Sequence, residues 1–165
     1  MASTNRRVSL TSNSLPVPYA CAASTENGGG PGTEAFRAFD GTKNVPGTEW
    51  VATTTTGTIY YDFGSRMWAL DGYGIQPQST TRAPKNWTFE GSQDASSWTV
   101  LDTRSNQTSW TSNVMVDYTV TGNTTMYRYY RLNISANNGD AGFLEIEEIY
   151  LYAADRGGAF LFNLV

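Results

Sequence analysis

Apolar and polar residues alternate along several short stretches of the chain, and this alternation predicts β-strands. Between residues 84 and 102, Trp87 and Phe89 alternate with polar neighbours, and a turn rich in Ser and Asp separates them from an apolar run that begins at Trp98. A side-chain period of two is that of a strand with one buried face. The pattern therefore predicts two strands joined by a short loop, with both tryptophans facing a core.

Further strands are predicted by β-branched and aromatic runs that end at Gly, Asn or Asp residues. These runs cover residues 58–63, 68–75, 114–120, 127–134 and 142–152. The one helical window, residues 34–39, is too short to form alone. Roughly eight strands at close spacing, without a long helix between them, predict an antiparallel sandwich of jelly-roll or Greek-key type.

The composition agrees with an all-β domain and excludes several classes of function. The 165 residues carry 15 acidic and 11 basic side chains, and the basic residues do not cluster. Nucleic acid is therefore not expected as a partner, because phosphate binding depends on clustered cations. The chain has no histidine, which excludes histidine-dependent triads and the usual zinc sites. A pair of carboxylates remains for catalysis, but no pair stands out, so we expect no enzyme activity.

Signals for export or membrane insertion are not evident in the sequence. The N-terminus has no apolar run of signal-peptide length, and nowhere do 18 apolar residues occur together. We therefore expect a soluble protein that is made in the cytoplasm and does not insert into membranes. Cys21 is the one cysteine, so no intrachain disulfide can form, and its small apolar neighbours predict a buried, inert thiol.

Residues 38–50 bend twice, at Asp40–Gly41 and at Pro46–Gly47. A doubly bent loop leaves carbonyl groups without ladder partners, and these groups could surround a hard cation together with the Asp40 carboxylate and the Thr48 hydroxyl. The alternative is a turn in which the Asp40 side chain bonds to the backbone and no ion is bound. From these residues alone both arrangements stay open.

Six segments, taken together and in this order, resemble the discoidin family, also called the coagulation factor V/VIII type C domains, which includes galactose-binding-like carbohydrate-binding modules. The segments are AFDG (38–41), TEW (48–50), IYYDFG (59–64), NWTFEGSQDASSWTVLD (86–102), YRYYRLNI (127–134) and EIYLY (148–152). The resemblance implies an all-β, eight-stranded antiparallel jelly-roll sandwich that binds rather than catalyses. It divides the chain into an N-terminal arm (1–18), a discoidin-like β-sandwich (19–152) and a C-terminal docking tail (153–165).

In many relatives a structural calcium ion sits where the D-G turn meets the last strand. Mapped onto this chain, the resemblance implies a Ca²⁺ site formed by carboxylates, a hydroxyl and main-chain oxygens: Asp40, Lys43, Asn44, Thr48 and Glu148. Calcium takes about six to eight oxygen ligands, which such a loop and a remote carboxylate supply. The alternative is that Asp40 caps the turn while Glu148 pairs with Arg37 or Lys43.

Two features depart from the family pattern. Type C domains often close their ends with a disulfide, which Cys21 alone cannot make, and sugar-binding members often use a histidine, which this chain lacks.

Ligand sites in this family lie on loops at one end of the sandwich, where an aromatic ring stacks on a sugar and polar side chains bond to its hydroxyls. Trp50, Trp87 and Trp98 belong to the family's core pattern and are expected to be buried. The residues nearer the loops are candidates for contact with a glycan: Trp68, Tyr73, Arg82, Arg104, Asn106, Trp110, Asn137 and Asn138. For Trp110, stacking on a ligand competes with packing on the sandwich, because large aromatic side chains are mostly buried.

The C-terminus carries an apolar run after Gly157 and Gly158: Phe160, Leu161, Phe162, Leu164 and Val165. An apolar end in water favours aggregation, so we expect this tail to dock on its own sandwich or, preferably, on another subunit of an assembly. A polar arm, a docking tail and no signal peptide are similar to virion components of bacteriophages.

The sequence thus suggests a non-catalytic adhesion module that binds host-surface glycans as an exposed part of a phage tail or capsid. Its expected location is the virion, or the extracellular space after cytoplasmic synthesis. The alternative is a structural or decoration protein of a virion, whose arm and tail mediate assembly without glycan binding.

Overall fold

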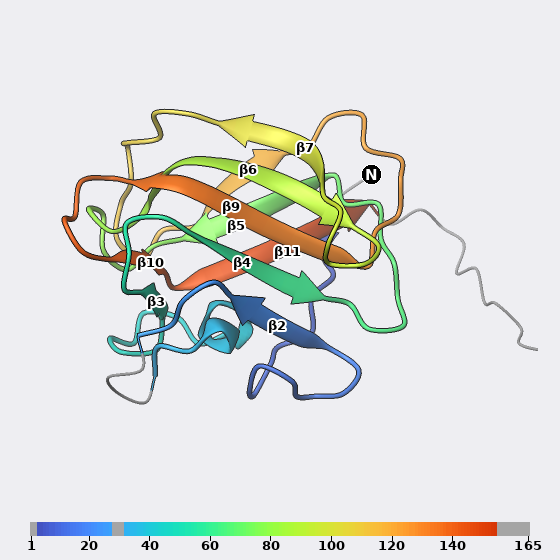
Figure 1. Ribbon diagram of the computed structural model, residues 1–165, viewed down its shortest axis with the longest axis horizontal. Helices are drawn as coiled ribbons and strands as arrows, with labels where there is room; N and C mark the ends of the chain where they lie inside the picture. Colours follow the sequence, from blue (N-terminus) through green and yellow to red (C-terminus); the bar gives the residue numbers. More distant parts are fainter. Residues whose placement is uncertain (1–2, 28–31, 155–165) are drawn as a thin grey trace, which may run out of the picture.

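Two antiparallel β-sheets pack face to face and enclose an aromatic core (Figure 1). The computed structural model describes residues 3–27 and 32–154. One sheet has five strands, in the order β2 (Ala20–Ala23), β4 (Gly57–Asp62), β9 (Tyr129–Asn137), β6 (Pro84–Ser92) and β7 (Thr99–Arg104). The other has four, in the order β1 (Ser3–Asn5), β11 (Glu148–Ala154), β5 (Gly72–Gln76) and β8 (Val116–Thr119). The predicted all-β antiparallel sandwich is confirmed.

Smaller elements close one side of the sandwich. A short pair joins β3 (Trp50–Ala52) to β10 (Leu144–Ile146), and the 3-10 helix η1 (Ala35–Phe39) packs against β2, β3 and β11. The helix coincides with the predicted helical window. In the described part of the chain, no helix is long and apolar enough to cross a membrane.

The segment 142–152, which the sequence predicts as one strand, is divided between two sheets. Leu144–Ile146 pairs with β3, and the chain then changes partner at Glu147, so that Glu148–Ala154 pairs with β5. The three residues of β10 are all buried, and so are the first two of β11. Because the strand changes sheets, its apolar residues do not follow a single period.

The core contains two of the three tryptophans that the family pattern places there. Trp50 and Trp87 are buried, and a stack of aromatic rings joins the sheets, with ring centroids 4.3 Å apart for Tyr73 and Phe89. Trp98 is only partly buried, so the prediction of a core position was wrong. It precedes the edge strand β7 and lies on the outer face of the five-stranded sheet, where the Arg131 guanidinium carbon is 4.2 Å from its ring centroid.

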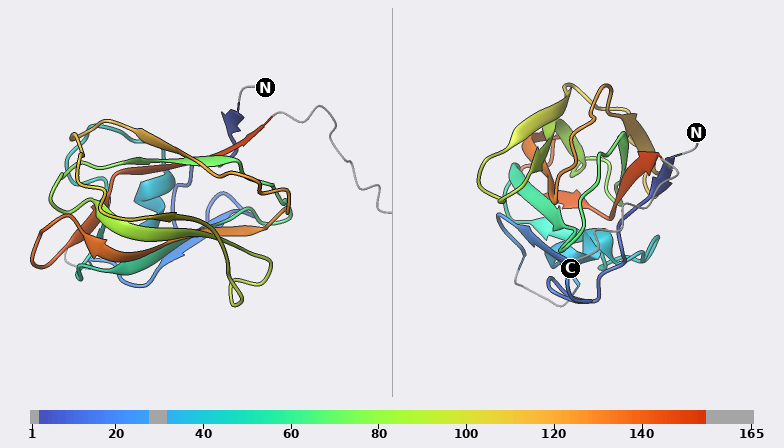
Figure 2. Two further views of the ribbon diagram at one scale, coloured as in Figure 1. Left: turned by 90° about the horizontal axis from the view of Figure 1, so that it is seen from above. Right: turned by 90° about the vertical axis from the view of Figure 1, so that its right-hand side faces the viewer.

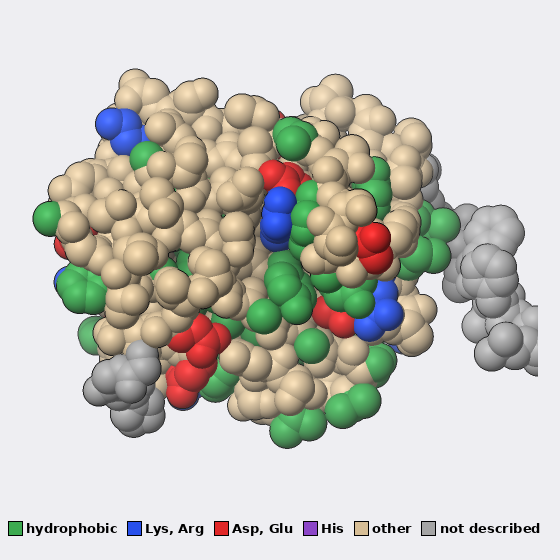
Figure 3. All heavy atoms as spheres, in the orientation of Figure 1, with side chains coloured by type: hydrophobic (Ala, Val, Ile, Leu, Met, Phe, Trp, Pro, Cys, Tyr) green, Lys and Arg blue, Asp and Glu red, His purple; other side chains and the backbone are tan. Residues whose placement is uncertain are grey.

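The outer face of the five-stranded sheet carries an aromatic group around Trp98. The rings of Tyr60 and Trp98 are 6.3 Å apart, and those of Tyr60 and Tyr129 are 6.1 Å apart. The space-filling view of the molecule from this side shows hydrophobic side chains next to charged ones in an otherwise mostly neutral surface (Figure 3).

The N-terminal arm lies on the sandwich instead of projecting from it. Ser3–Asn5 pairs antiparallel with the end of β11, so the two ends of the described chain lie side by side (Figure 2). Leu10 is buried and its N–H donates to the carbonyl of Phe39 (3.0 Å). The predicted apolar tail, with Phe160 to Val165, lies outside the described residues.

Cys21 lies on β2 and is buried, as the sequence predicts. Burial raises the pKa of its thiol above the ordinary value, and the nearby Glu26 carboxylate raises it further. The thiol is therefore protonated and inert at neutral pH.

Candidate functional site

Three loops meet at one end of the sandwich, the left end in Figure 1. They connect β5 to β6 (77–83), β7 to β8 (105–115) and β9 to β10 (138–143). Backbone hydrogen bonds tie them together: the N–H of Asn138 donates to Ala83 (2.9 Å), that of Asp140 to Thr81 (3.1 Å) and that of Asn113 to Pro77 (2.7 Å). Because the loops support one another, side chains on their surface are held in a fixed arrangement.

A hollow of about 320 Å³ opens beside the 105–115 loop and the edge strand β8. Amides, hydroxyls and two aromatic rings line it: Asn106, Gln107, Thr108, Ser109, Trp110, Val116 and Tyr118. Among these described lining residues, none is charged. The lining thus combines hydrogen-bonding groups with flat apolar surface.

Trp110 and Tyr118 form the apolar wall of this hollow. Trp110 is 9% exposed, and its indole N–H donates to the carbonyl of Pro84 (2.9 Å) while its ring lies 6.1 Å from that of Trp87. Of the two roles predicted for Trp110, packing on the sandwich is therefore the main one, and little of its side chain is exposed to the hollow. Tyr118, which the sequence analysis did not single out, lies in the alternating stretch 114–120, so its ring was predictable only as a strand residue.

Arg104 lies at the margin of the hollow, over the ring of Tyr118. Its guanidinium carbon is 4.9 Å from the ring centroid, and the group is held by Asp102 (2.7 Å) and by the carbonyl of Thr119 (3.2 Å). Burial raises the pKa of Tyr118 to about 12, against the effect of the Arg104 charge. The phenol therefore stays protonated and can donate a hydrogen bond.

Two other predicted contact residues lie elsewhere. Tyr73 is completely buried in the core, where it accepts a hydrogen bond from the indole of Trp87 (2.8 Å) and donates one to Asp102 (2.8 Å). The prediction that Tyr73 contacts a ligand from a loop is therefore corrected, because β5 turns this ring inward. Trp68 forms a backbone bridge with Tyr127 at the opposite end of the sandwich, under the guanidinium of Arg6 (4.7 Å).

Arg82, Asn137 and Asn138 do gather at the loop end, but with different roles. The Asn137 amide donates to the carbonyls of Asp140 (2.8 Å) and Phe143 (2.6 Å), so it holds its own turn. The Asn138 amide reaches the carbonyls of Thr80 (3.0 Å) and, across to the hollow, Thr108 (3.4 Å).

Arg82 is partly exposed, and it pairs with acids of the loop end. It pairs with Asp140 (3.3 Å) and Glu145 (3.4 Å), with 37% of its side chain exposed. Burial raises the pKa of Glu145, and the neighbouring Glu49 carboxylate adds to the rise. Glu49 is itself buried, and its Oε2 finds no hydrogen-bond partner in the described part of the chain. The sequence analysis missed Glu49, because nothing in its local pattern separates it from a surface acid.

The D-G turn and the start of β11, where the sequence predicts calcium, lie against each other. The Gly41 N–H donates to Glu148 Oε1 (2.6 Å), and the Thr42 N–H donates to Asp40 Oδ1 (2.6 Å), so Asp40 caps its turn. Asp40 also pairs with Arg37 (3.2 Å). Glu148 pairs with neither of the expected partners, Arg37 or Lys43, but with Arg7 of the N-terminal arm.

The other predicted calcium ligands are also engaged with the protein. The Thr48 hydroxyl donates to the carbonyl of Val45 (2.7 Å), the Asn44 N–H donates to Glu147, and the Lys43 ammonium lies 4.2 Å from the ring centroid of Tyr150. Burial raises the pKa of Glu148, while the Arg7 charge and the Gly41 N–H hold that rise down. In the ranges 3–27 and 32–154, no group of three or more acidic or cysteine side chains is arranged to hold a metal ion. The Asp40 and Glu148 carboxylates are thus bonded to N–H groups and arginines, and this arrangement does not fit an open calcium site.

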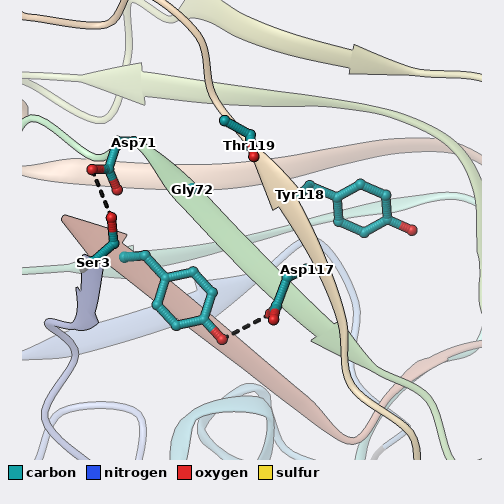
Figure 4. Close-up of a pocket in the computed structure, with 7 residues that line it drawn as sticks. Ser3, Asp71, Gly72, Asp117, Tyr118 and Thr119 are labelled. Carbon is teal, nitrogen blue, oxygen red and sulfur yellow. Dashed lines mark hydrogen bonds between the residues drawn. The ribbon is translucent and has the colours of Figure 1, made fainter. Parts of the chain in front are cut away.

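A second hollow, of about 300 Å³, lies on the outer face of the four-stranded sheet (Figure 4). In the close-up, the Ser3 hydroxyl points to Asp71, to which it donates a hydrogen bond of 2.8 Å. The Tyr152 hydroxyl donates a hydrogen bond of 2.8 Å to Asp117. Gly72 forms part of the lining, where an added Cβ would lie 2.9 Å from the carbonyl oxygen of Tyr118. None of the predicted contact residues lines this hollow.

Comparison with known families identifies this sandwich. The model of the F5/8 type C domain matches residues 20–149, and the chain belongs to this family. The predicted discoidin-like fold is therefore confirmed. No match was found among curated proteins.

Several solved structures share the fold. Chitosan-binding module 1, derived from the chitosanase/glucanase of Paenibacillus sp. IK-5, is 20% identical with a TM-score of 0.67, over 90% of this chain and 99% of that one. CpGH89CBM32-5 from Clostridium perfringens, solved with GalNAc-β-1,3-galactose, is 17% identical with a TM-score of 0.66, over 82% and 95%. The family 32 module of C. perfringens NanJ, solved with galactose, is 16% identical with a TM-score of 0.64, over 82% and 93%. At these identities the similarity establishes the fold.

Proposed function

We propose that this domain binds glycans without acting on them chemically, and that a sugar occupies the hollow beside the 105–115 loop. The observation that carries the proposal is the lining of that hollow, in which amides and hydroxyls stand next to Trp110 and Tyr118. A sugar ring presents hydroxyls at its edge and C–H groups on its face, so it needs both kinds of surface. The structural neighbours that were solved with sugars support the same class of ligand.

The hollow selects for a small and neutral sugar unit. Its described lining residues carry no charge, and the Arg104 cation over Tyr118 is already paired with Asp102. Its volume of about 320 Å³ lies at the lower end of the range for ligand sites. We therefore infer that it accepts a terminal residue of a neutral glycan and not a long buried chain.

A glycan array with the full chain identifies ligands, and titration of the best ligand with two variants then locates the site. Gln107→Ala removes an amide whose only hydrogen bond within the described chain is to the carbonyl of Ser105. The matched control, Gln93→Ala, removes an exposed glutamine of the β6–β7 turn, whose amide bonds to the carbonyl of Met126. We expect affinity to fall about tenfold in the first variant, as for one lost hydrogen bond, and to stay unchanged in the second.

Other outcomes of this titration have definite meanings. Equal affinity for the two variants and the unaltered protein would remove the sugar from this hollow. Loss of affinity in Trp98→Ala alone would place the site on the aromatic group of the five-stranded sheet. The absence of any glycan ligand on the array would refute the proposed function.

We further propose that the domain is an exposed component of a phage tail or capsid and contacts glycans of the host surface. The polar arm and the apolar residues of the tail, Phe160 to Val165, support this proposal. The alternative is a decoration protein that assembles without binding glycans. Both ideas predict that deletion of residues 157–165 abolishes assembly, measured by light scattering with purified virion proteins. Glycan affinity separates them: an exposed glycan-binding component is expected to keep its affinity in the deletion variant, whereas a decoration protein has none.

A further inference from the structure

The guanidinium of Arg7 lies between the D-G turn and the start of β11, where the family resemblance predicts a calcium ion. One of its nitrogens donates to the carbonyl of Phe39, directly before Asp40, and another pairs with Glu148 Oε2. Its carbon lies 4.8 Å from the ring centroid of Tyr150. The group therefore contacts a carbonyl, a carboxylate and an aromatic face, all of which attract positive charge.

Both partners of this ion pair are inaccessible to solvent. The side chain of Arg7 is 2% exposed and that of Glu148 is 0% exposed. A carboxylate at this depth is stable only with a partner, because the interior does not solvate the charge. Glu148 has two such partners, since the Gly41 N–H donates to its other oxygen.

The arm is fixed on both sides of Arg7, so the guanidinium is held in position. Before Arg7, the β1 strand pairs with β11, and the Arg6 N–H donates to the carbonyl of Leu151 (2.7 Å). After Arg7, the N–H and carbonyl of Val8 both bond to the hydroxyl of Tyr61 (2.9 and 2.8 Å). A side chain that is anchored this way loses little further entropy when it enters the site.

The bases of the turn are already engaged by acids and by an aromatic ring. Arg7 pairs with Glu148, Arg37 pairs with Asp40 and Glu34, and the Lys43 ammonium lies over the ring of Tyr150. Calcium would add two positive charges. At this place it would need the two oxygens that the Arg7 guanidinium contacts, the Phe39 carbonyl oxygen and Glu148 Oε2. Ion and guanidinium therefore compete for the same oxygens.

We propose that Arg7 is the built-in cation of this domain, and that it holds the D-G turn against β11 in place of a calcium ion. The domain then folds and keeps its loop end in shape in the absence of calcium, and its N-terminal arm is part of the folded unit. This inference does not depend on the proposed glycan binding.

Thermal unfolding of the full chain tests the inference first without any substitution. We expect the melting temperature to stay within about 1 °C when EDTA or millimolar Ca²⁺ is added. A calcium ion bound at 100 times its dissociation constant would raise the melting temperature by about 5–10 °C. Such a rise in the unaltered protein, or calcium binding detected by titration calorimetry, would overturn the proposal.

Arg7→Gln then removes the charge and leaves a shorter polar side chain. Breaking a buried ion pair is expected to lower the melting temperature by roughly 6–20 °C. Calcium is expected to restore part of this loss, because the freed oxygens are ligands for a hard cation. The matched control is Arg37→Gln, at the same turn but 27% exposed, which is expected to lose about 3 °C or less and not to respond to calcium.

The variants can also refute the inference. An Arg7→Gln protein as stable as the unaltered one would show that the guanidinium does not hold the turn. If Arg7→Gln does not fold at all, Arg7→Lys, which retains the charge, is expected to fold without calcium, and a calcium requirement in that variant would contradict the proposal.

Discussion

Replacing Tyr73 by Phe removes one hydroxyl from the centre of the sandwich and is expected to destabilise it clearly. This hydroxyl accepts a hydrogen bond from the indole of Trp87 (2.8 Å) and donates one to Asp102 (2.8 Å), which in turn pairs with Arg104 (2.7 Å). Tyr73 lies on β5 and its partners lie on β6 and β7. The chain of hydrogen bonds therefore links the two sheets.

The size of the effect follows from what the substitution leaves behind. The ring contacts with Phe89 (4.3 Å) and Tyr118 (5.2 Å) are kept in the Phe variant, so no large cavity forms. The indole N–H of Trp87 is left in the core without an acceptor, which costs about 1–3 kcal/mol. Asp102 keeps Arg104, so its loss is smaller. We expect the free energy of unfolding to fall by about 2–3 kcal/mol in total, or roughly 5–10 °C in melting temperature for a chain of this length.

Urea and thermal unfolding of Tyr73→Phe, Trp87→Phe and the double variant measure this network. The double variant is expected to lose about 1 kcal/mol less than the sum of the single variants, because it removes the donor and its acceptor together. Tyr152→Phe is the matched control, since its hydroxyl donates to Asp117 at the surface, and it is expected to lose about 0.5 kcal/mol or less. If Tyr73→Phe is as stable as this control, the buried network does not join the sheets.

Three further predictions concern other parts of the sandwich. Gly91→Ala places a Cβ 2.5 Å from the ring of Tyr127 and is expected to cost about 1–3 kcal/mol in chemical denaturation, whereas Gly142→Ala, with 4.0 Å to its nearest neighbour, should be neutral. Burial raises the pKa of the Cys21 thiol and keeps it protonated. A disulfide reagent is therefore expected to label the folded protein at under roughly 1% of its rate with the unfolded chain. Equal labelling rates would contradict the burial of Cys21. Burial also raises the pKa of Glu145, so the stability of the fold falls as the pH rises from the pKa of the unfolded chain through the pKa of the folded one. Glu145→Gln is therefore expected to raise the melting temperature at pH 7 but not near pH 4. Equal changes in melting temperature at both pH values would contradict this expectation.

The strands were predictable where one face of the sheet is buried and the other is not. In β9 and in residues 87–89 of β6, the alternation of apolar and polar residues follows the alternation of core and solvent, so a period of two is visible in the sequence. The predicted strand 68–75 begins too early, because Trp68 makes only an isolated bridge and the regular pairing starts at Gly72. The switch at Glu147 was not predictable from periodicity, because both β10 and the start of β11 are buried on all sides.

The candidate site was harder to predict than the fold, because an aromatic residue has the same sequence signal in a core and in a binding site. Trp110 stands in a polar loop and yet is buried, since the loop closes the open side between the edge strands β7 and β8. Trp98 stands in an apolar run and yet lies outside, since it precedes an edge strand and rests on Arg131. Which ring is available to a ligand depends on the order of strands in the sheets, which local patterns do not contain.

The role of Arg7 shows the same limit for charges. Local reasoning pairs Glu148 with the bases of the nearby turn, Arg37 or Lys43, but the observed partner lies 141 residues away in the sequence. It reaches Glu148 because β1 aligns the arm along β11 and so brings the next residues to the D-G turn. A polar arm has no period that would reveal this pairing. The loop retains the residues that resemble a calcium site, and the N-terminal arm supplies the Arg7 guanidinium that binds there. A chain that lacks the arm, including Arg7, is therefore expected to need calcium to hold this turn.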